Sequence, residues 1–431
     1  MRPVLIVASD FPPSSYPPAL RNRFFAAHLK EFGWCPTVLT VKSEYYEWKT
    51  DSNQLDLLTN SIEVIRTEAL PVKLTRQFGI GDLGMRSLWH HWQALNRICK
   101  EREFELIFIS IPPYLPAILA RLVYEKFKIP YVIDYIDPWT TANYWRLPKP
   151  QRPFKRTLSY FLSRIFEPCV LQRVGHIVGV SKGTTDSVLA RYSWLDDSCT
   201  TEIPYGGEAS DFDYLRKNPR KNKIFNRDDG FFHMSSVGIA GVNMRPTLEA
   251  TFKAVCEGWK RSPVIFNSLR LHFIGTTYAS NTNGSYSVLP LAKRFGLERY
   301  VEEYPSRVSY WDAIQVLIDS HALLALGSNA SHYTPSKIFP YILARRPLLA
   351  IYREESTAVD ILRETNAGKL VTFGNEGFSE DKVREVSQHL EEILSPHPDY
   401  IPPTSWEAFE RYTARAMTER LVKVFDHVVS K

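Results

Sequence analysis

The sequence contains few cysteines, and none of them forms a closely spaced pair. Five cysteines are spread over 431 residues, and no Cys-x-x-Cys motif occurs. This spacing provides neither a disulfide framework nor a zinc-binding pattern. A reducing cytosol is therefore the expected compartment.

Long hydrophobic runs are also missing from the sequence. No stretch approaches the roughly 20 apolar residues that a membrane-spanning helix needs. The first apolar run, Val4–Ala8, is too short for the core of a signal peptide and is followed by Asp10 and prolines. We expect this run to be a buried strand. The protein is expected to be cytoplasmic, and either soluble or bound peripherally at the inner face of the cell membrane.

Basic residues only slightly outnumber acidic residues. The 53 basic and 47 acidic residues leave a formal net charge of +6, and the 44% hydrophobic content is ordinary for a globular protein. No nucleic-acid recognition module accompanies this mild charge, so no nucleic-acid partner is predicted. The chain length suits two domains better than one.

Short apolar runs alternate with amphipathic stretches along both halves of the chain. In the first half, strands are expected at Val4–Ala8, Pro36–Val41, Ile62–Arg66, Leu106–Ile109, Tyr131–Ile136 and Ile177–Val180, with helices at Leu20–Phe32 and Ala117–Phe127. In the second half, strands are expected at His233–Val237, Leu269–Ile274, Tyr300–Glu303, Ala322–Leu326 and Leu348–Ile351. This alternation predicts an α/β fold of two tandem Rossmann-like domains, each with a doubly wound parallel sheet.

The domain boundaries follow from composition. Residues 1–205 form the first predicted domain, and residues 231–403 form the second. Between them, residues 206–230 are polar, charged and rich in turn-forming residues, which predicts a linker. Residues 404–431 are expected to form a C-terminal helix that packs back on the first domain.

Loops that follow the predicted strands are the expected places for ligands, because open parallel sheets bind ligands beyond the carboxyl ends of their strands. Small, polar and basic residues of this kind suit phosphate groups. We expect the two domains to face a central cleft with these loops, which are Ser9–Pro18, Asp137–Trp139, Ser181–Gly183, Gly238–Arg245 and Gly327–Lys337.

Several segments, in this order and spacing, resemble the retaining GT-B glycosyltransferases of the group-1/family-4 type. They are VLIVASDFPPSSYPPALRNRFFAAHLKEFGWCPTVLT, IPYVIDYIDPWT, HIVGVSKGTTDSVL with IPYGGEASDFDYL, SSVGIAGVNMRPTLEATFKAV, and TPSKIFPYILARRPLLAI. The resemblance implies a hexosyltransferase-like enzyme of polysaccharide or glycolipid biosynthesis. It places the acceptor on residues 1–205 and a nucleotide-sugar donor, UDP- or GDP-linked, on residues 231–403. It also implies transfer with retention of configuration, and without a metal or other cofactor.

On the donor side, the resemblance assigns Arg245 and Lys337 to the diphosphate. Basic side chains at these places would neutralise the charge that develops on the leaving group. The alternative for both residues is an ordinary solvated cation at a helix start. Further donor contacts are predicted from Gly238, His332, Thr334 and Ser336.

The sequence departs from the family pattern at several of these positions. His332 and Pro340 stand where the family usually has two glutamates, the second of which holds the nucleotide ribose. Ile239 follows Gly238 where the family has an arginine. Ribose recognition in this chain must therefore differ from the family pattern.

On the acceptor side, Ser14 and Ser15 take the place of the family's glycine pair, and Arg21 begins the first helix. Arg21 is either a contact for an anionic or hydroxyl group of a substrate or a surface arginine. Asp137 is a candidate to orient or deprotonate the acceptor hydroxyl, with capping of the following turn as the alternative. Asp134 lies inside an apolar strand, where a carboxylate needs a partner.

Residues 146–182 carry many basic side chains with aromatic residues between them. Such a segment either lies on an anionic membrane, where it meets a lipid-linked acceptor, or packs its aromatic residues on the sheet. The Gly-x-Gly-x-x-Gly pattern at 79–84 follows no apolar strand, so a dinucleotide site is rejected there.

Two other functions are compatible with the same fold. One is a nucleotide-sugar 2-epimerase, which needs carboxylates and a histidine around the sugar; the thin supply of carboxylates at the strand ends argues against it. The other is a nucleotide-sugar-binding protein that has lost catalysis together with the two glutamates.

Overall fold

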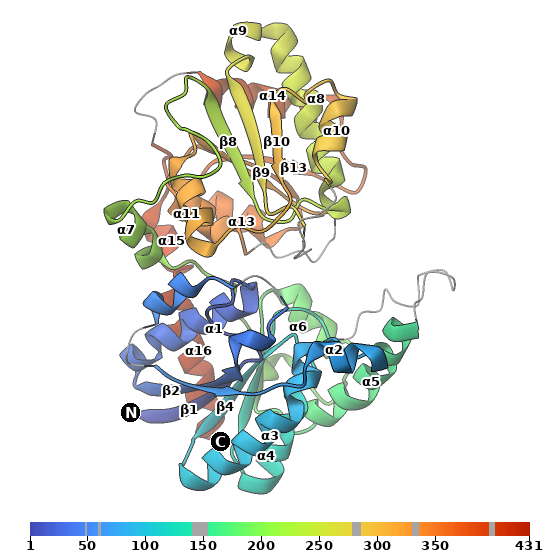
Figure 1. Cartoon of the computed structure of the whole chain (residues 1–431), viewed down its shortest axis with the longest axis vertical. Coiled ribbons are helices and arrows are strands. Elements are labelled where there is room, and N and C mark those ends of the chain that lie inside the picture. Colours follow the sequence, from blue (N-terminus) through green and yellow to red (C-terminus); the bar gives the residue numbers. More distant parts are fainter. Residues whose placement is uncertain (48–49, 59–61, 140–153, 278–285, 330–335, 396–400) are drawn as a thin grey trace. The chain divides into compact units, whose positions relative to one another are not determined.

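A computed structural model describes the chain except for residues 48–49, 59–61, 140–153, 278–285, 330–335 and 396–400. The chain divides into two compact units (Figure 1). Unit 1 comprises Met1–Tyr205 together with Ala414–Lys431, and unit 2 comprises Gly206–Thr413. Each unit contains one parallel sheet with helices on its faces, which confirms the predicted tandem Rossmann-like architecture.

The sheet of unit 1 has seven strands in the order β3-β2-β1-β4-β5-β6-β7, all paired in parallel. The predicted strands of the first half are all present. An additional short edge strand, β7, was not predicted, because it is polar rather than apolar. The strands are β1 (Arg2–Val7), β2 (Trp34–Val41), β3 (Glu63–Thr67), β4 (Leu106–Ile111), β5 (Tyr131–Tyr135), β6 (His176–Gly179) and β7 (Thr200–Glu202).

Helices cover both faces of this sheet. The helices of unit 1 are α1 (Pro17–His28), α2 (Val72–Thr75), α3 (Leu83–Glu101), α4 (Ala117–Phe127), α5 (Phe154–Leu171), α6 (Lys182–Leu189) and α16 (Ala414–Val429). The first helix begins and ends earlier than the predicted Leu20–Phe32, and the chain continues as a 3-10 turn over Leu29–Phe32 before Gly33, with a φ of 83°, ends it.

The C-terminal helix α16 packs on α1 and on the sheet of unit 1, as expected. The ring of Phe425 lies edge-on to Phe108 of β4 with the centroids 5.5 Å apart, and Phe108 meets Phe25 of α1 at 5.7 Å. All three side chains are buried. Residues far apart in sequence thus build one face of the unit 1 core.

The sheet of unit 2 has six strands in the order β10-β9-β8-β11-β12-β13, again all parallel. The strands are β8 (Phe232–Val237), β9 (Leu269–Ile274), β10 (Val301–Tyr304), β11 (Ala322–Leu326), β12 (Leu348–Arg353) and β13 (Lys369–Phe373). The helices are α7 (Ala209–Lys217), α8 (Arg245–Arg261), α9 (Pro263–Phe266), α10 (Leu289–Arg294), α11 (Tyr310–Asp319), α12 (Ile338–Leu343), α13 (Thr357–Thr365), α14 (Glu380–Leu394) and α15 (Trp406–Glu410).

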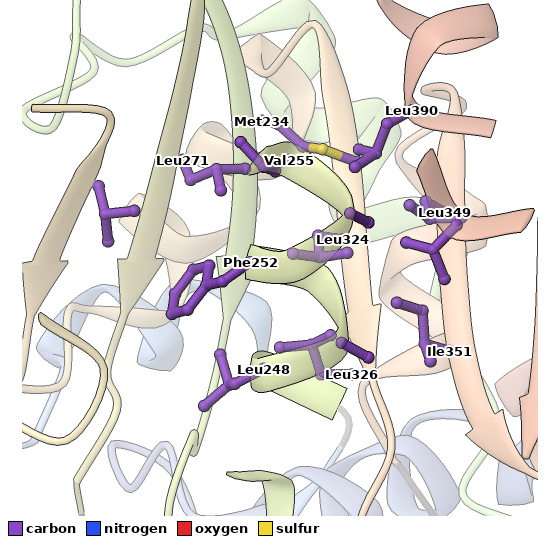
Figure 2. Close-up of a cluster of buried hydrophobic side chains, with 14 of the residues drawn as sticks. Met234, Leu248, Phe252, Val255, Leu271, Leu324, Leu326, Leu349, Ile351 and Leu390 are labelled. Carbon is purple, nitrogen blue, oxygen red and sulfur yellow. The ribbon is translucent and has the colours of Figure 1, made fainter. Parts of the chain in front are cut away.

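Helix α8 presents its apolar face to the sheet of unit 2 (Figure 2). Leu248, Phe252 and Val255 lie at helical spacing and join one buried cluster. The same cluster contains side chains from all six strands and from α14, including Met234, Leu271, Leu324, Leu349 and Leu390. The helix that follows β8 is therefore held rigidly, which fixes the loop between them.

Residues 206–230, expected as a linker, lie within unit 2. Helix α7 packs on α11, and the Phe225 ring stacks on His233 with the centroids 4.4 Å apart. The guanidinium of Arg227 donates to the carbonyl of Asp319 at 2.8 Å. The polar composition of this segment therefore reflects hydrogen bonding across unit 2. At the other end, residues 404–413 also belong to unit 2, and the C-terminal helix begins only at Ala414.

Candidate functional site

On unit 2, Gly238, which follows β8, lies close to Lys337, which precedes α12. Gly238 has a φ of 124°, a backbone conformation that favours glycine. Its amide donates to the carbonyl of Ile274 at 2.8 Å, which anchors the loop to β9. A β-carbon at this position would lie 3.7 Å from Cδ of Lys337. The carboxyl end of β8 and the start of α12 therefore meet at one edge of the sheet.

Lys337 is a half-buried cation at the residue before α12. Its Nζ lies 3.9 Å from Sδ of Met244, and among the residues that the structure describes no carboxylate pairs with it. Burial lowers the pKa of Lys337 from its usual 10.5 to about 8. Placing an ammonium group here without a compensating charge costs free energy, so the site favours an anionic ligand.

Tyr341 of α12 was not singled out in the sequence, yet it fixes this arrangement. Its hydroxyl accepts from the amide of Val237 at 2.6 Å and donates to the carbonyl of Val237 at 3.0 Å. The side chain is 1% exposed. Tyr341 thereby ties α12 to the last residue of β8, directly before Gly238. The sequence offered one indication of this role. Tyr341 stands among apolar residues of its helix, and a buried tyrosine hydroxyl needs a hydrogen-bond partner.

Arg245 does not stand beside Lys337 as a second unpaired cation. It begins α8, and its Nε donates to Oε1 of Glu249, one turn further on, at 2.9 Å. The arginine side chain is 54% exposed. Such a surface pair contributes only about 0–1 kcal/mol, so a phosphate could compete for the guanidinium. The residue that contacts Lys337 is instead Met244, which directly precedes Arg245 in the sequence.

The remaining predicted donor contacts are only partly visible. Ser336 is half-buried and directly precedes Lys337. His332 and Thr334 lie outside the described residues, so their roles stay predictions. Pro340, at the second of the family's glutamate positions, is the third residue of α12 and half-buried.

On unit 1, the loop after β1 is organised by a carboxylate that the sequence did not single out. Asp10 is 3% exposed and accepts a hydrogen bond from Oγ of Ser14 at 3.1 Å. Burial raises the pKa of Asp10 to about 7. Ser14 also accepts from the amide of Tyr16 at 3.2 Å, and Ser15 accepts from Nε2 of Gln54 at 2.6 Å. Both predicted serines thus hold the loop in shape.

Arg21 serves unit 1 internally, which corrects its predicted role as an acceptor contact. The residue is fully buried, and two of its nitrogens donate to the carboxylate of Asp134 at 2.8 and 3.0 Å. Two further bonds reach the carbonyls of Ile203 and Pro204 at 2.8 and 2.7 Å. Asp134, also buried, accepts in addition from Ser110 at 3.1 Å. The guanidinium is therefore committed to α1, β5 and the chain after β7.

Asp137 follows β5 and is exposed. Around it lie tyrosines that the sequence reading missed. The pKa values of Tyr114 and Tyr205 are raised by burial first and by the charge of Asp137 second. Tyr114 donates to the carbonyl of Pro138 at 3.0 Å and stacks on Trp139, so the turn that carries Asp137 is fixed. An exposed carboxylate on a fixed turn can orient a hydroxyl group of a ligand.

The two sets of residues offer different chemistry. Unit 2 presents the half-buried cation of Lys337 beside Gly238, whose positive φ shapes the loop after β8. Unit 1 presents the exposed carboxylate of Asp137 near two tyrosines. Within the described ranges, no three histidine, cysteine or acidic side chains come together as a metal site.

Comparison with known proteins identifies the fold. No protein-family model and no curated protein matches the sequence. HepE from Anabaena, solved with UDP and glucose, is 12% identical, with a TM-score of 0.60 over 99% of this chain and 100% of HepE. A glycosyltransferase from Rickettsia africae is 12% identical, with a TM-score of 0.58 over 100% of this chain and 99% of its own. A putative UDP-N-acetylglucosamine 2-epimerase from Listeria monocytogenes is 11% identical, with a TM-score of 0.52 over 97% and 94%.

The chain is similar to these proteins along its whole length, and its two parallel-sheet units have the GT-B fold. At such low identities the likeness establishes the fold alone, because a shared fold hosts several activities.

Proposed function

We propose that the protein is a nucleotide-sugar-dependent glycosyltransferase, which moves a sugar from a UDP- or GDP-linked donor to a glycan, lipid-linked or small-molecule acceptor. The observation that carries this proposal is Lys337, a half-buried ammonium group without a described carboxylate partner, beside Gly238 at the carboxyl edge of the unit 2 sheet. Support comes from the GT-B fold and from HepE, which was solved with UDP-glucose as well.

In the proposed reaction, Lys337 neutralises the charge that develops on the leaving diphosphate. Arg245 exchanges Glu249 for a phosphate oxygen and adds a second cation. Asp137 orients the acceptor hydroxyl. With retention of configuration, an oxygen of the departing phosphate takes the acceptor's proton, so neither an enzyme nucleophile nor a metal ion is required.

The surface of α5 favours a lipid-linked acceptor. Such an acceptor would belong to polysaccharide or glycolipid synthesis and would be reached at the inner face of the cell membrane. Phe161 and Ile165 of this helix are 52% and 63% exposed, and Arg164 is exposed between them. The one acidic residue of α5, Glu167, is buried and bonded to Arg191 at 2.7 Å. An exposed surface of apolar and basic side chains suits an anionic bilayer. Within the described part of the chain, no helix is long and apolar enough to cross one.

The donor proposal is tested by thermal stabilisation with a panel of UDP, GDP and their sugars. A donor at about 100 times its Kd should stabilise the protein by about 2.7 kcal/mol. We expect Lys337→Ala to abolish the shift and Lys253→Ala, at an exposed lysine of α8, to keep it. If no nucleotide raises the melting temperature of the native protein, the proposal fails.

The Listeria likeness keeps a 2-epimerase as a second candidate. Incubation of the protein with UDP-N-acetylhexosamines distinguishes the two, because an epimerase interconverts the C2 epimers without an acceptor, whereas a transferase hydrolyses the donor slowly. A nucleotide-sugar-binding protein without catalysis would show the thermal shift and neither reaction. The absence of the family's two glutamates at His332 and Pro340 is consistent with such a protein.

A further inference from the structure

Unit 1 contains a hollow away from Asp10 and Asp137. It has a volume of about 320 Å³, large enough for a small ligand. It lies between α16 and the strands β6 and β7, at the edge of the sheet. Its lining residues are His176, Thr201, Arg420, Lys423, Val424 and His427.

The lining is basic and contains no carboxylate. Arg420, Lys423 and His427 follow one another on α16 at intervals of three and four residues, so they share one face of the helix. Asp426 is bonded elsewhere, to Arg2 at 2.7 Å and to Trp34 at 3.1 Å. The acidic residue nearest along the helix is Glu419, 3.3 Å from Lys423, whose side chain is 73% exposed. Such an exposed pair holds Lys423 only weakly.

The sheet side of the hollow is polar and rigid. His176, the first residue of β6, is 4% exposed, and its Nε2 lies 2.8 Å from Oγ1 of Thr201. The pKa of His176 is lowered to about 4, by burial first and then by the positive charges of His427 and Lys431. Arg420 and Lys423 are thus the cations of this edge; burial raises the pKa of the nearby Glu202 carboxyl, and the charge of Arg420 counters that rise. Arg420 is positioned by a hydrogen bond to the carbonyl of Glu202.

We propose that this hollow binds a phosphate group of a small soluble molecule, as a second anion site distinct from the proposed donor site. Several basic groups around a cavity without carboxylates suit an oxyanion, which accepts charge-assisted hydrogen bonds from them. A soluble ligand is favoured over a lipid headgroup, because the exposed large apolar side chains of the described residues include none from α16, β6 or β7.

The position of the hollow separates it from the proposed chemistry. His176 begins β6 at the amino-terminal edge of the sheet, whereas Asp10 and Asp137 follow the carboxyl ends of β1 and β5. Because all strands of this sheet are parallel, the two groups lie at opposite edges. A phosphate bound here would link α16 to the edge strand β7 and so stabilise unit 1 rather than take part in transfer.

The test is calorimetric titration of the full-length protein with inorganic phosphate, at constant ionic strength with chloride as the balancing ion. Phosphate could also enter the donor site, so the titration uses Lys337→Ala as the background. We expect phosphate to bind this variant, and the further changes Lys423→Ala and His427→Gln to raise its Kd at least about tenfold. Both side chains are exposed, so these changes should leave the fold intact. Lys100→Ala, at an exposed lysine of α3, is the matched control and should leave Kd unchanged.

Titration with UDP separates this proposal from the donor proposal. The tight UDP binding of the donor site should be lost in Lys337→Ala, which leaves only the phosphate affinity of the hollow, and it should be kept in the Lys423→Ala, His427→Gln variant. The phosphate site is refuted if phosphate does not bind the Lys337→Ala background, or if the α16 changes leave its Kd unaltered. Sedimentation with phosphatidic acid vesicles that requires Lys423 and His427 would likewise refute a soluble ligand.

Discussion

Replacing Lys337 with methionine should make the ligand-free protein more stable while it removes nucleotide binding. Burial lowers the pKa of this lysine from 10.5 to about 8, which means that the folded state disfavours the charged form. At about 1.36 kcal/mol per pKa unit, the cost at neutral pH is at most about 3 kcal/mol. Lys337 is only half-buried, so screening by water reduces the expected gain to about 1–2 kcal/mol.

The pH dependence of stability tests whether the charged form of Lys337 destabilises the folded state. The folded-state pKa lies below the unfolded value, so the unfolded state holds the proton more tightly. The cost of the charged lysine is therefore fully present below about pH 8 and disappears as the pH rises towards 10.5. The stabilities of the native protein and Lys337→Met should converge over that interval.

Urea unfolding at pH 7, with and without UDP, measures both consequences. Lys337→Met should raise the free energy of unfolding without UDP and lose the increment that UDP gives the native protein. Lys253→Met, at an exposed position on α8, should change neither quantity. A methionine variant that is less stable than the native protein at pH 7 would show that Lys337 is compensated within the fold, and the argument for an anionic ligand would fail.

Three further outcomes are expected. Phe425→Ala should destabilise unit 1 by about 3–5 kcal/mol in urea unfolding, because the ring is fully buried; a loss below about 1 kcal/mol would mean that α16 docks without it. Arg21→Ala should cost about 3–5 kcal/mol by leaving Asp134 charged and buried, and adding Asp134→Asn should recover part of that loss; no recovery would contradict the pairing. Burial lowers the pKa values of His321 and His91 from 6.5 to about 4 and about 3, so stability should fall as the pH drops below 6.5 towards these values; replacing His91 with asparagine should weaken that pH dependence, and an unchanged slope would contradict it.

The parts of the fold that depend on buried apolar runs could be predicted from sequence. Ala322–Leu326 is apolar throughout, and Leu106–Ile111 is apolar except for Ser110, because helices cover both faces of each sheet. The edge strand Thr200–Glu202 is polar and very short, so it gave no such signal. Lys369–Phe373 was missed as well, because only two of its five residues are buried and its apolar run is short.

The glycines of residues 79–84 show why a motif needs its structural context. Gly79 has a φ of 79° and ends a 3-10 turn, and a β-carbon on Gly84 would lie 2.6 Å from Cβ of Pro113. Gly79 thus serves a turn, and Gly84, the second residue of α3, serves close packing; α2 and a 3-10 turn, rather than a strand, lie directly before them. The sequence reading rejected a dinucleotide site here but overlooked α3, which Asp82 caps by accepting from the amide of Met85 at 2.9 Å.

The candidate site could be predicted only where a single residue carries the signal. Gly238 and Lys337 were singled out because the segments that contain them resemble the GT-B glycosyltransferases; the structure places the two residues side by side, and their role stays a prediction. Arg21 and Asp134 were weighed separately, and their mutual pairing depends on the register of β5 against α1, which no local pattern shows. Asp10 gave no signal by itself, because no local pattern shows that its carboxyl is buried and bonded to Ser14.

The return of α16 to unit 1 has a consequence for biosynthesis. Phe425, Leu421 and Met417 complete a core to which Val4, Ile6 and Phe108 also belong, yet all of unit 2 is translated between these two groups. A ribosome that has finished residues 1–205 therefore presents one face of the first sheet without its covering helix. Unit 2 can fold on the ribosome as a continuous segment. Unit 1 cannot complete its core until α16 has been translated, and until then its apolar surface is open to chaperones. Stalled or prematurely terminated chains should aggregate through that surface even when unit 2 is already folded.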